Sequence, residues 1–241
     1  MKLQELREFF KEDMSCDLAI HLTSNLNWHR YEQQVGILAG DIRKNSVVLD
    51  VGCGTGAQAV MLSVLRPDLT IYATDIDYHE SWQNLRRFKI KFSKDNAEHM
   101  NFRDNVFDAV ISFGVLEHLD HPENFLKEVK RVGRHHALFY IFNLPNKYSI
   151  NEFLADRIGI SPHKNRYTVK SINKMLWDND FRVMWDKREF LIPSLVNLYS
   201  KKLGNMFNKT YRFLDMLDKI IILTPLNYFA QSIEIISEVR K

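Results

Sequence analysis

The sequence predicts a doubly wound α/β fold, in which helices cover both faces of a mostly parallel sheet. Two observations lead to this prediction. Strand-like runs alternate with helix-like segments along the chain. The first run, Val47–Val51, leads directly into the glycine-rich turn GCGTG, as buried parallel strands do at nucleotide sites. A chain of 241 residues with 45% hydrophobic content is long enough for one such domain.

Seven segments have the apolar or alternating pattern of strands. The last of them has Ile233, Ile235 and the less apolar Ser237 at alternate positions, and we expect it to be an edge strand because it lies close to the terminus. The seven predicted strands are Ser46–Val51, Leu69–Thr74, Ile90–Ser93, Val106–Phe113, His136–Phe142, Phe181–Phe190 and Ser232–Val239.

Helices are predicted between the strands and at the start of the chain. Residues 1–14 have an amphipathic charged pattern and lack the apolar centre of a signal peptide. A helix between the first two strands and a second one beginning at Pro122, a favoured first-turn residue, present apolar faces to the sheet. These faces consist of Ala59, Met61, Leu62 and Leu65 in one helix and Phe125, Leu126, Val129 and Val132 in the other.

About forty residues, 192–231, separate the sixth and seventh strands, and this connection is long for a bare nucleotide-binding sheet. We expect two or three short helices there. They could form a lid over an apolar acceptor or a patch that contacts a membrane surface, using Lys201, Lys202, Lys209 and Arg212. The simpler alternative is an amphipathic cap that completes the core or forms a dimer face.

The cysteine content, the hydropathy and the net charge of the chain exclude several classes of protein. The only cysteines, Cys16 and Cys53, provide neither a disulfide framework nor a metal site, which fits a reducing cytoplasm, and no metal ion is expected. No run is long enough to span a membrane, since Ile220–Leu223 is soon followed by Pro225. The net charge of +3 is too weak for a nucleic-acid groove.

The glycine-rich turn predicts the kind of ligand. Gly52, Gly54 and Gly56 allow a tight turn and close approach of a ligand, and the following helix offers free N–H groups. Dinucleotide sites have the spacing G-x-G-x-x-G, which makes room for a pyrophosphate. Here the spacing is G-x-G-x-G behind Asp50. We therefore expect a nucleoside whose tail carries an amine.

Acids follow the next two strands. Asp75, with Asp77 as the second candidate, is placed to accept the ribose hydroxyls of a nucleoside. Asp95 can accept from an exocyclic adenine amine, and the small side chain of Ala97 leaves room for a flat ring.

The ordered motifs VLDVGCGTG, TDID and KDNAEHMNFRDNVFDAVISFGVLEHLDHPENFLKEVKRV resemble those of class I S-adenosylmethionine-dependent methyltransferases, especially the group acting on small molecules and lipids. The resemblance covers residues 46–142. It departs at Gly133-Arg134-His135-His136, where that group has a Pro-Gly-Gly turn. It implies a Rossmann-like, seven-stranded sheet with an antiparallel last strand in a single domain, 1–241. That domain divides into N-terminal helices at 1–45, a cofactor-binding core at 46–190, a helical insert at 191–231 and the last strand at 232–241.

The resemblance also implies roles for individual residues toward S-adenosylmethionine. Asp50 would meet the amino group and the three glycines would surround the methionine part. Asp75 would bind the ribose and Ile76 would lie against the adenine. The remaining assignments are Asp95, Asn96 and Ala97 to the adenine edge and the backbone of Phe113 to the methyl group.

Methyl transfer from a sulfonium depends mainly on positioning and exclusion of water, although an oxygen or nitrogen acceptor can need a base. His118, His163 and Tyr167 are the candidates, because they follow strands at the ligand edge of the sheet. Each histidine could equally be a structural loop residue. Residues 28–31 could close over the cofactor, with Arg30 on its carboxylate, or could simply pack a helix on the sheet.

We therefore predict a cytoplasmic methyltransferase that acts, most simply, on an oxygen of a small-molecule, sugar or lipid-linked acceptor and not on nucleic acid. A nucleic-acid methyltransferase is disfavoured because GVLEHL occupies the place of an N-P-P-Y-like tetrad. A nicotinamide dehydrogenase is disfavoured by the glycine spacing. A non-catalytic subunit that binds S-adenosylmethionine stays open as an alternative.

Overall fold

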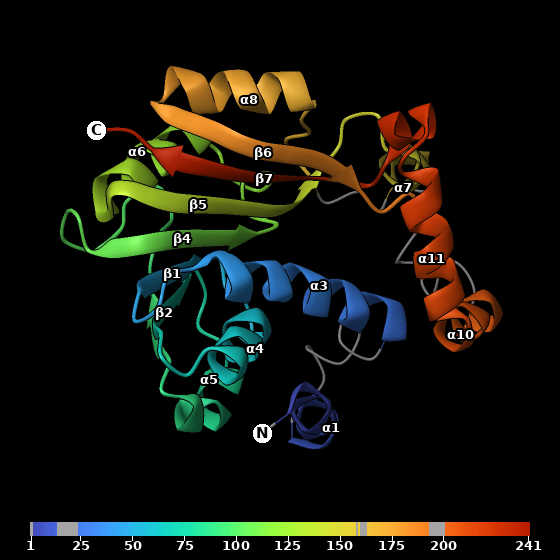
Figure 1. Ribbon diagram of the computed structural model, residues 1–241, viewed down its shortest axis with the longest axis horizontal. Helices are drawn as coiled ribbons and strands as arrows, with labels where there is room; N and C mark the ends of the chain where they lie inside the picture. The colour runs from blue at the N-terminus through green and yellow to red at the C-terminus, as the bar shows by residue number, and fades with distance from the viewer. Residues whose placement is uncertain (1, 14–23, 158, 160–162, 193–200) are drawn as a thin grey trace.

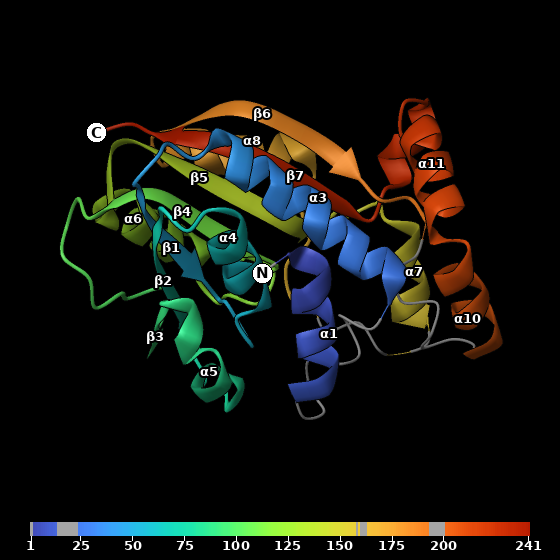
Figure 2. The same ribbon diagram turned by 60° about the horizontal axis from the view of Figure 1, so that its bottom comes forward.

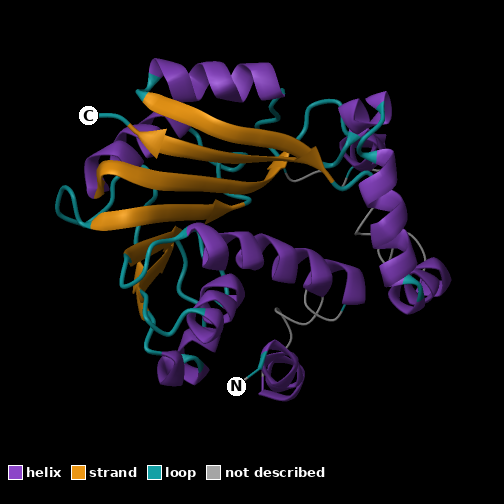
Figure 3. Cartoon of the chain, in the orientation of Figure 1, coloured by secondary structure: helices purple, strands orange, loops and turns teal. Residues whose placement is uncertain are grey.

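The computed structural model describes residues 2–13, 24–157, 159, 163–192 and 201–241. Seven strands form one sheet in the order β3-β2-β1-β4-β5-β7-β6, and β7 runs antiparallel to both of its neighbours (Figure 3). Every predicted strand is present, so the predicted fold is confirmed. The strands are β1 (Val47–Val51), β2 (Thr70–Asp75), β3 (Lys91–Lys94), β4 (Phe107–Phe113), β5 (Gly133–Pro145), β6 (Phe181–Glu189) and β7 (Ser232–Val239).

The expectation that the last strand lies at an edge was wrong. β7 is inserted between β5 and β6, pairing Ile236 with Tyr140 on one side and with Trp185 on the other. The polar side chain of Ser237 is fully buried and donates to the carbonyl oxygen of Phe139 at 3.3 Å. Proximity to the terminus says nothing about the place of a strand in a sheet, and β6 is the edge strand instead.

Helices cover both faces of the sheet (Figures 1 and 2). One face carries α1 (Leu3–Asp13), α3 (Asn25–Asp41), α4 (Ala57–Leu65) and the short helices α5 (Ser81–Asn84) and η1 (Arg86–Phe88). The other face carries α6 (Pro122–Val132) and α8 (Val169–Asp178). Beyond the carboxyl ends of β5 and β6 lie α7 (Ile150–Arg157), α10 (Lys201–Lys209) and α11 (Tyr211–Ile221), and η2 (Pro225–Phe229) precedes β7. Within the described residues, no helix combines the length and the apolar character needed to cross a membrane.

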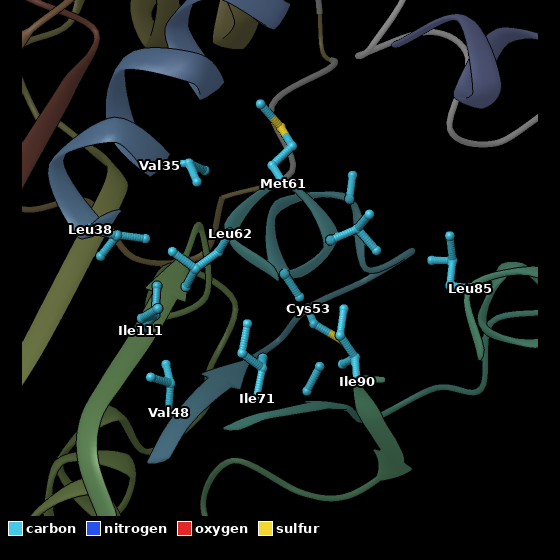
Figure 4. Packing of buried hydrophobic residues seen from close by; sticks show 14 of the residues in the cluster. Val35, Leu38, Val48, Cys53, Met61, Leu62, Ile71, Leu85, Ile90 and Ile111 are labelled. Carbon is cyan, nitrogen blue, oxygen red and sulfur yellow. The ribbon is translucent and has the colours of Figure 1, made fainter. Parts of the chain in front are cut away.

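Each face of the sheet has its own hydrophobic core. Figure 4 shows Val35 and Leu38 of α3 and Leu62 of α4 near the strand residues Val48 and Ile111. On the opposite face, the four predicted apolar residues of α6 are fully buried. The spacing of three and four residues along α6 therefore determines which side faces the sheet.

The buried position of β7 gives a direct stability test. Ile235→Ala should lower the free energy of unfolding by about 2–5 kcal/mol, because it leaves a cavity in a closely packed core. Ile220→Ala, on an exposed position of α11, should change it by less than about 0.5 kcal/mol. Urea denaturation of the two variants measures the difference. Equal effects would contradict the interior placement of β7.

Candidate functional site

The turn between β1 and α4 has a backbone conformation that favours glycine at three positions. Gly52, Gly54 and Gly56 all have positive φ angles, of 70°, 51° and 88°. The N–H of Gly54 donates to Oδ2 of Asp75 at 2.7 Å, which fixes the turn against the end of β2. A Cβ at position 52 would lie 2.4 Å from a methyl carbon of Val115. Only glycine therefore lets this turn lie against the segment that follows β4.

A cavity of about 430 Å³ opens where β1, β2, β3 and β4 end. Six of the ten predicted cofactor-binding residues line it: Gly52, Asp75, Ile76, Asp95, Asn96 and Ala97. The other lining residues, which the sequence did not single out as cofactor contacts, are Val51, Glu98, Gly114, Val115, His118, Leu119 and Asp120. The site thus lies at the carboxyl edge of the sheet, where ligands bind in open α/β folds.

The other four predicted residues lie around this cavity without lining it. Asp50 is buried in β1, one residue before the turn, and Gly54 forms the turn itself. Gly56 faces away, because a Cβ there would lie 2.7 Å from the ring of Phe92. The ring of Phe113 stacks on Phe142 with centroids 5.0 Å apart. Gly56 and the Phe113 side chain therefore pack the protein interior.

Asp50 is the most unusual group near the cavity. Its carboxyl is 3% exposed, and its Oδ1 atom has no hydrogen-bond partner among the described residues. Burial, reinforced by the negative charge of Asp75, raises the pKa of Asp50 to about 8. Two neighbouring carboxyl groups make this end of the site favourable for a cation and unfavourable for a phosphate.

Asp75 and Asp95 also organise the loops on which they lie. Besides the Gly54 contact, Asp75 accepts from the N–H of Asp77 at 3.1 Å through Oδ1. Asp95 accepts from the backbone and side-chain nitrogens of Asn101 at 2.9 and 3.0 Å. A carboxylate has about four lone-pair sites, so both acids keep acceptor capacity for a ligand.

A second, smaller cavity of about 190 Å³ lies between α3, α7 and the ends of β5 and β6. Most of the residues that line it are of polar types, among them Arg30, Glu117, Glu152 and His163. The remaining lining residues are Asn27, Tyr31, Asn143, Pro145, Phe190, Gln231 and Ser232. Burial raises the pKa of Glu117 to about 7. The cavity is therefore suited to a polar group.

The predicted catalytic histidines come together, whereas the tyrosine does not join them. The ring of His118, beside the first cavity, lies 5.4 Å from that of His163, beside the second. Burial and the neighbouring His163 and Lys164 lower the pKa of His118. Burial alone would lower the pKa of His163, but the hydrogen bond and charge of Glu152 outweigh it and raise that pKa.

Tyr167 lies in the hydrophobic core under α8, 5% exposed, and its hydroxyl donates to the carbonyl oxygen of Leu116 at 3.3 Å. Burial raises its pKa to about 12. It lines neither of the two cavities, so this position disfavours the predicted role as a base.

Arg30 has a different partner from the one that the sequence suggested. Its guanidinium forms an ion pair with Asp218 of α11 at 3.3 Å and donates to the carbonyl oxygen of Ile192 at 2.8 Å. Burial lowers its pKa to about 10, although the charge of Asp218 opposes that change. The arginine therefore ties the 191–231 insert to α3 beside the second cavity. The neighbouring Trp28 is 3% exposed and packs in the core.

Sequence reasoning missed Glu117 and Glu152 as cavity residues. Glu117 is the residue before His118, so its place in the motif was a usable signal. Glu152 comes from α7, after the end of the matched motifs, and nothing in the sequence connects it to the site.

Comparison with known proteins gives one family match. A family model for the methyltransferase domain matches residues 49–141. Sterol 24-C-methyltransferase of Pneumocystis carinii is 31% identical over 131 residues, which are 51% of this chain and 34% of that protein. A ubiquinone/menaquinone biosynthesis C-methyltransferase of Haemophilus ducreyi is 28% identical over 211 residues, covering 77% of this chain and 79% of the relative.

The chain spans between 34% and 64% of the length of the first curated relatives that it matches. Among solved structures, the YcgJ protein of Bacillus subtilis has a TM-score of 0.61 at 15% identity, with 87% of this chain and 99% of that one covered. At such low identity the structural likeness establishes the fold alone.

The raised pKa of Asp50 predicts how stability depends on pH. An acid whose pKa rises from about 4 in the unfolded chain to about 8 on folding binds its proton more tightly in the folded state. Its contribution to the free energy of unfolding is therefore greatest below about pH 4 and declines as the pH rises toward 8. Relative to Asp50→Asn, the ligand-free wild-type protein should lose stability across this range, by at most about 1.4 kcal/mol per pH unit.

Chemical denaturation at a series of pH values measures this difference. The exposed Asp77 provides the matched control, and Asp77→Asn should follow the wild-type curve. Parallel curves for wild type and Asp50→Asn would show that Asp50 is not held protonated by its surroundings.

Proposed function

We propose that the protein binds S-adenosylmethionine and transfers its methyl group to a small-molecule, sugar or lipid-linked acceptor. The proposal is supported by the match of residues 49–141 to the methyltransferase-domain family model and by the order of the strands in the sheet. Bound S-adenosylmethionine supplies a methyl group already activated on a sulfonium. The protein then has to bind the two reactants, orient them and exclude water.

The observation that carries this proposal is the buried, unpaired Oδ1 of Asp50 at the glycine turn. Although Asp50 does not itself line the cavity, an ammonium group bound at the glycine turn would reach this carboxylate directly or through a water molecule, and the charge of Asp75 adds to the attraction. A nicotinamide dinucleotide would instead bring a pyrophosphate toward two carboxyl groups. The chemistry of the donors therefore favours S-adenosylmethionine.

The rest of the first cavity fits the nucleoside. Asp75 would accept the ribose hydroxyls, and the exposed side chain of Ile76 would cover one face of the adenine. Asp95, Asn96 and Ala97 line the same cavity and would meet the adenine edge. The Phe113 backbone, at the end of β4, would border the methyl group.

The second cavity is the proposed acceptor site. Its polar lining suits the reacting end of an acceptor that carries hydroxyl groups, and oxygen is the atom that we propose is methylated. His118 and His163 lie between the two cavities, where a base would take a proton from such a hydroxyl.

The remainder of a lipid-linked acceptor would contact the apolar surface next to this cavity. Large apolar side chains of α10, α11 and η2 are exposed: Leu203, Met206, Phe213, Met216, Ile220, Leu226, Tyr228 and Phe229, together with Leu223 before η2. The sterol and quinone named in the two curated relatives are also apolar molecules. The insert 191–231 would then make peripheral contact with a membrane surface.

Cofactor binding is tested by calorimetry with S-adenosylhomocysteine. Asp75→Ala should weaken binding by roughly 10- to 150-fold, because charge-assisted hydrogen bonds are worth about 1.5–3 kcal/mol. Asp75→Asn, which retains one oxygen acceptor, should have an intermediate effect. Asp77→Ala should leave the affinity unchanged. Tight binding of NAD without binding of S-adenosylhomocysteine would refute the proposal.

The acceptor is tested by turnover with a panel of glycans, quinols and hydroxylated lipids, the lipids presented in vesicles. For a vesicle-borne acceptor, the double variant Phe213→Ser, Leu223→Ser should lower turnover by about tenfold or more, because burial of each large apolar side chain is worth about 1.5–3 kcal/mol. Met184→Ser, an exposed position on β6, is the matched control. Unchanged turnover of the double variant would contradict the proposed membrane contact. Cofactor binding without turnover on any acceptor would favour the non-catalytic alternative.

A further inference from the structure

Three metal-ligating side chains meet between the two cavities. Glu117, His118 and His163 each offer a ligand atom, and these atoms all lie within 4.8 Å of one another. Glu117 and His163 line the second cavity, and His118 lines the first. The cluster therefore borders both proposed binding sites.

Glu117 lacks a partner for one of its oxygens. The residue is 2% exposed, and its buried Oε2 atom has no hydrogen-bond partner among the described residues. An ionised carboxylate in such a place is costly unless a cation or a donor meets it. Glu117 lines the second cavity, so a cation bound there would give this carboxylate the partner that it lacks.

His163 is oriented as a metal-ligating histidine commonly is. Its Nδ1 lies 2.9 Å from Oε1 of Glu152, a residue that is only 7% exposed. A carboxylate in this position holds a proton on Nδ1, so the lone pair of Nε2 is available for a metal ion. Glu152 would also raise the basicity of that nitrogen.

The backbone brings the cluster together before any ion binds. The N–H groups of Lys164 and Asn165 both donate to the carbonyl oxygen of Glu117 at 3.1 Å. The side chain of Asn165 donates to the carbonyl oxygen of Leu119 at 2.8 Å. These bonds fix the segment after His163 to the turn that carries Glu117 and His118.

We propose that Glu117, His118 and His163 form a binding site for a divalent transition-metal ion. Two imidazoles and one carboxylate are a donor set for Zn²⁺, Mn²⁺ or Fe²⁺ and leave coordination positions open. Ligand atoms at about 2.1 Å from a tetrahedral ion are about 3.4 Å apart, so the separations of up to 4.8 Å would close through side-chain movements of about 1 Å. No metal ion was expected from the sequence, because His163 lies 45 residues after His118 and none of the three ligands is a cysteine.

The site has a consequence that rests on the proposed function. A bound ion would occupy the lone pairs of His118 and His163, so these residues would act as its ligands, and the ion instead of a histidine base would bind and orient an oxygen of the acceptor. The acceptor class would then be molecules that present a hydroxyl, or two neighbouring oxygens, at one end.

The test is metal titration of the full chain after a chelator has removed bound metal. Binding of Mn²⁺ is measured by electron paramagnetic resonance, and binding of Zn²⁺ is measured by calorimetry. One ion per chain should bind saturably at micromolar concentration. Glu117→Gln and His163→Gln should each weaken binding at least tenfold, and Glu152→Gln by 10- to 100-fold. Thermal unfolding without metal confirms that each variant folds, and Zn²⁺ should raise the melting temperature of the wild type but not of Glu117→Gln.

His135→Gln is the matched control, because His135 is an exposed histidine at the start of β5. It should bind metal like the wild type. Saturable metal binding that disappears in His135→Gln but persists in His163→Gln would overturn the proposal. The proposal would also be wrong if the wild-type protein showed no saturable binding below millimolar concentration. Titration of the wild-type protein with S-adenosylhomocysteine separates the two proposals: metal binding without nucleoside binding refutes the function, and nucleoside binding without metal binding refutes the metal site.

Discussion

The burial of Asp50 at the end of β1 is the constraint on which the site depends. A carboxyl group in the middle of a parallel sheet loses its hydration, and here it gains no hydrogen bond to Oδ1 from the described residues in return. The fold tolerates this because the carboxyl can hold a proton when no cation is near. The glycine turn and Asp75 then surround the one place where a charged ligand would relieve the cost. The proposed recognition of the cofactor and the cost of burying this carboxyl group therefore have the same origin.

Much of the fold could be predicted because the relevant signals are local. Apolar runs identified the strands, and the helical period along α6 identified its buried face, since both depend on neighbouring residues only. Six of the residues lining the first cavity were predicted for a similar reason, because the carboxyl ends of adjacent parallel strands meet at one edge. The roles that follow from contact with a bound cofactor stay predictions.

What could not be predicted depends on contacts between distant segments. The interior place of β7 is set by pairing with both β5 and β6. The pairing of Arg30 with Asp218 joins residues 188 positions apart, and the contact of Glu152 with His163 depends on how α7 sits beside the loop that follows it. Tyr167 had the right residue type and place in the chain, but its side chain points into the core. Periodicity carries no information about any of these contacts.

The interior position of β7 has a consequence for the order in which the protein can fold during synthesis. Among the described residues, β6 pairs with β7 alone, yet about forty residues separate the two strands in the chain. Until β7 has been synthesised, β6 has no neighbour and the far side of β5 presents unpaired backbone groups beside an apolar surface. Such an edge invites pairing with other nascent chains. The newly made protein therefore passes through an interval in which its first half can already be folded while its sheet is still open to aggregation.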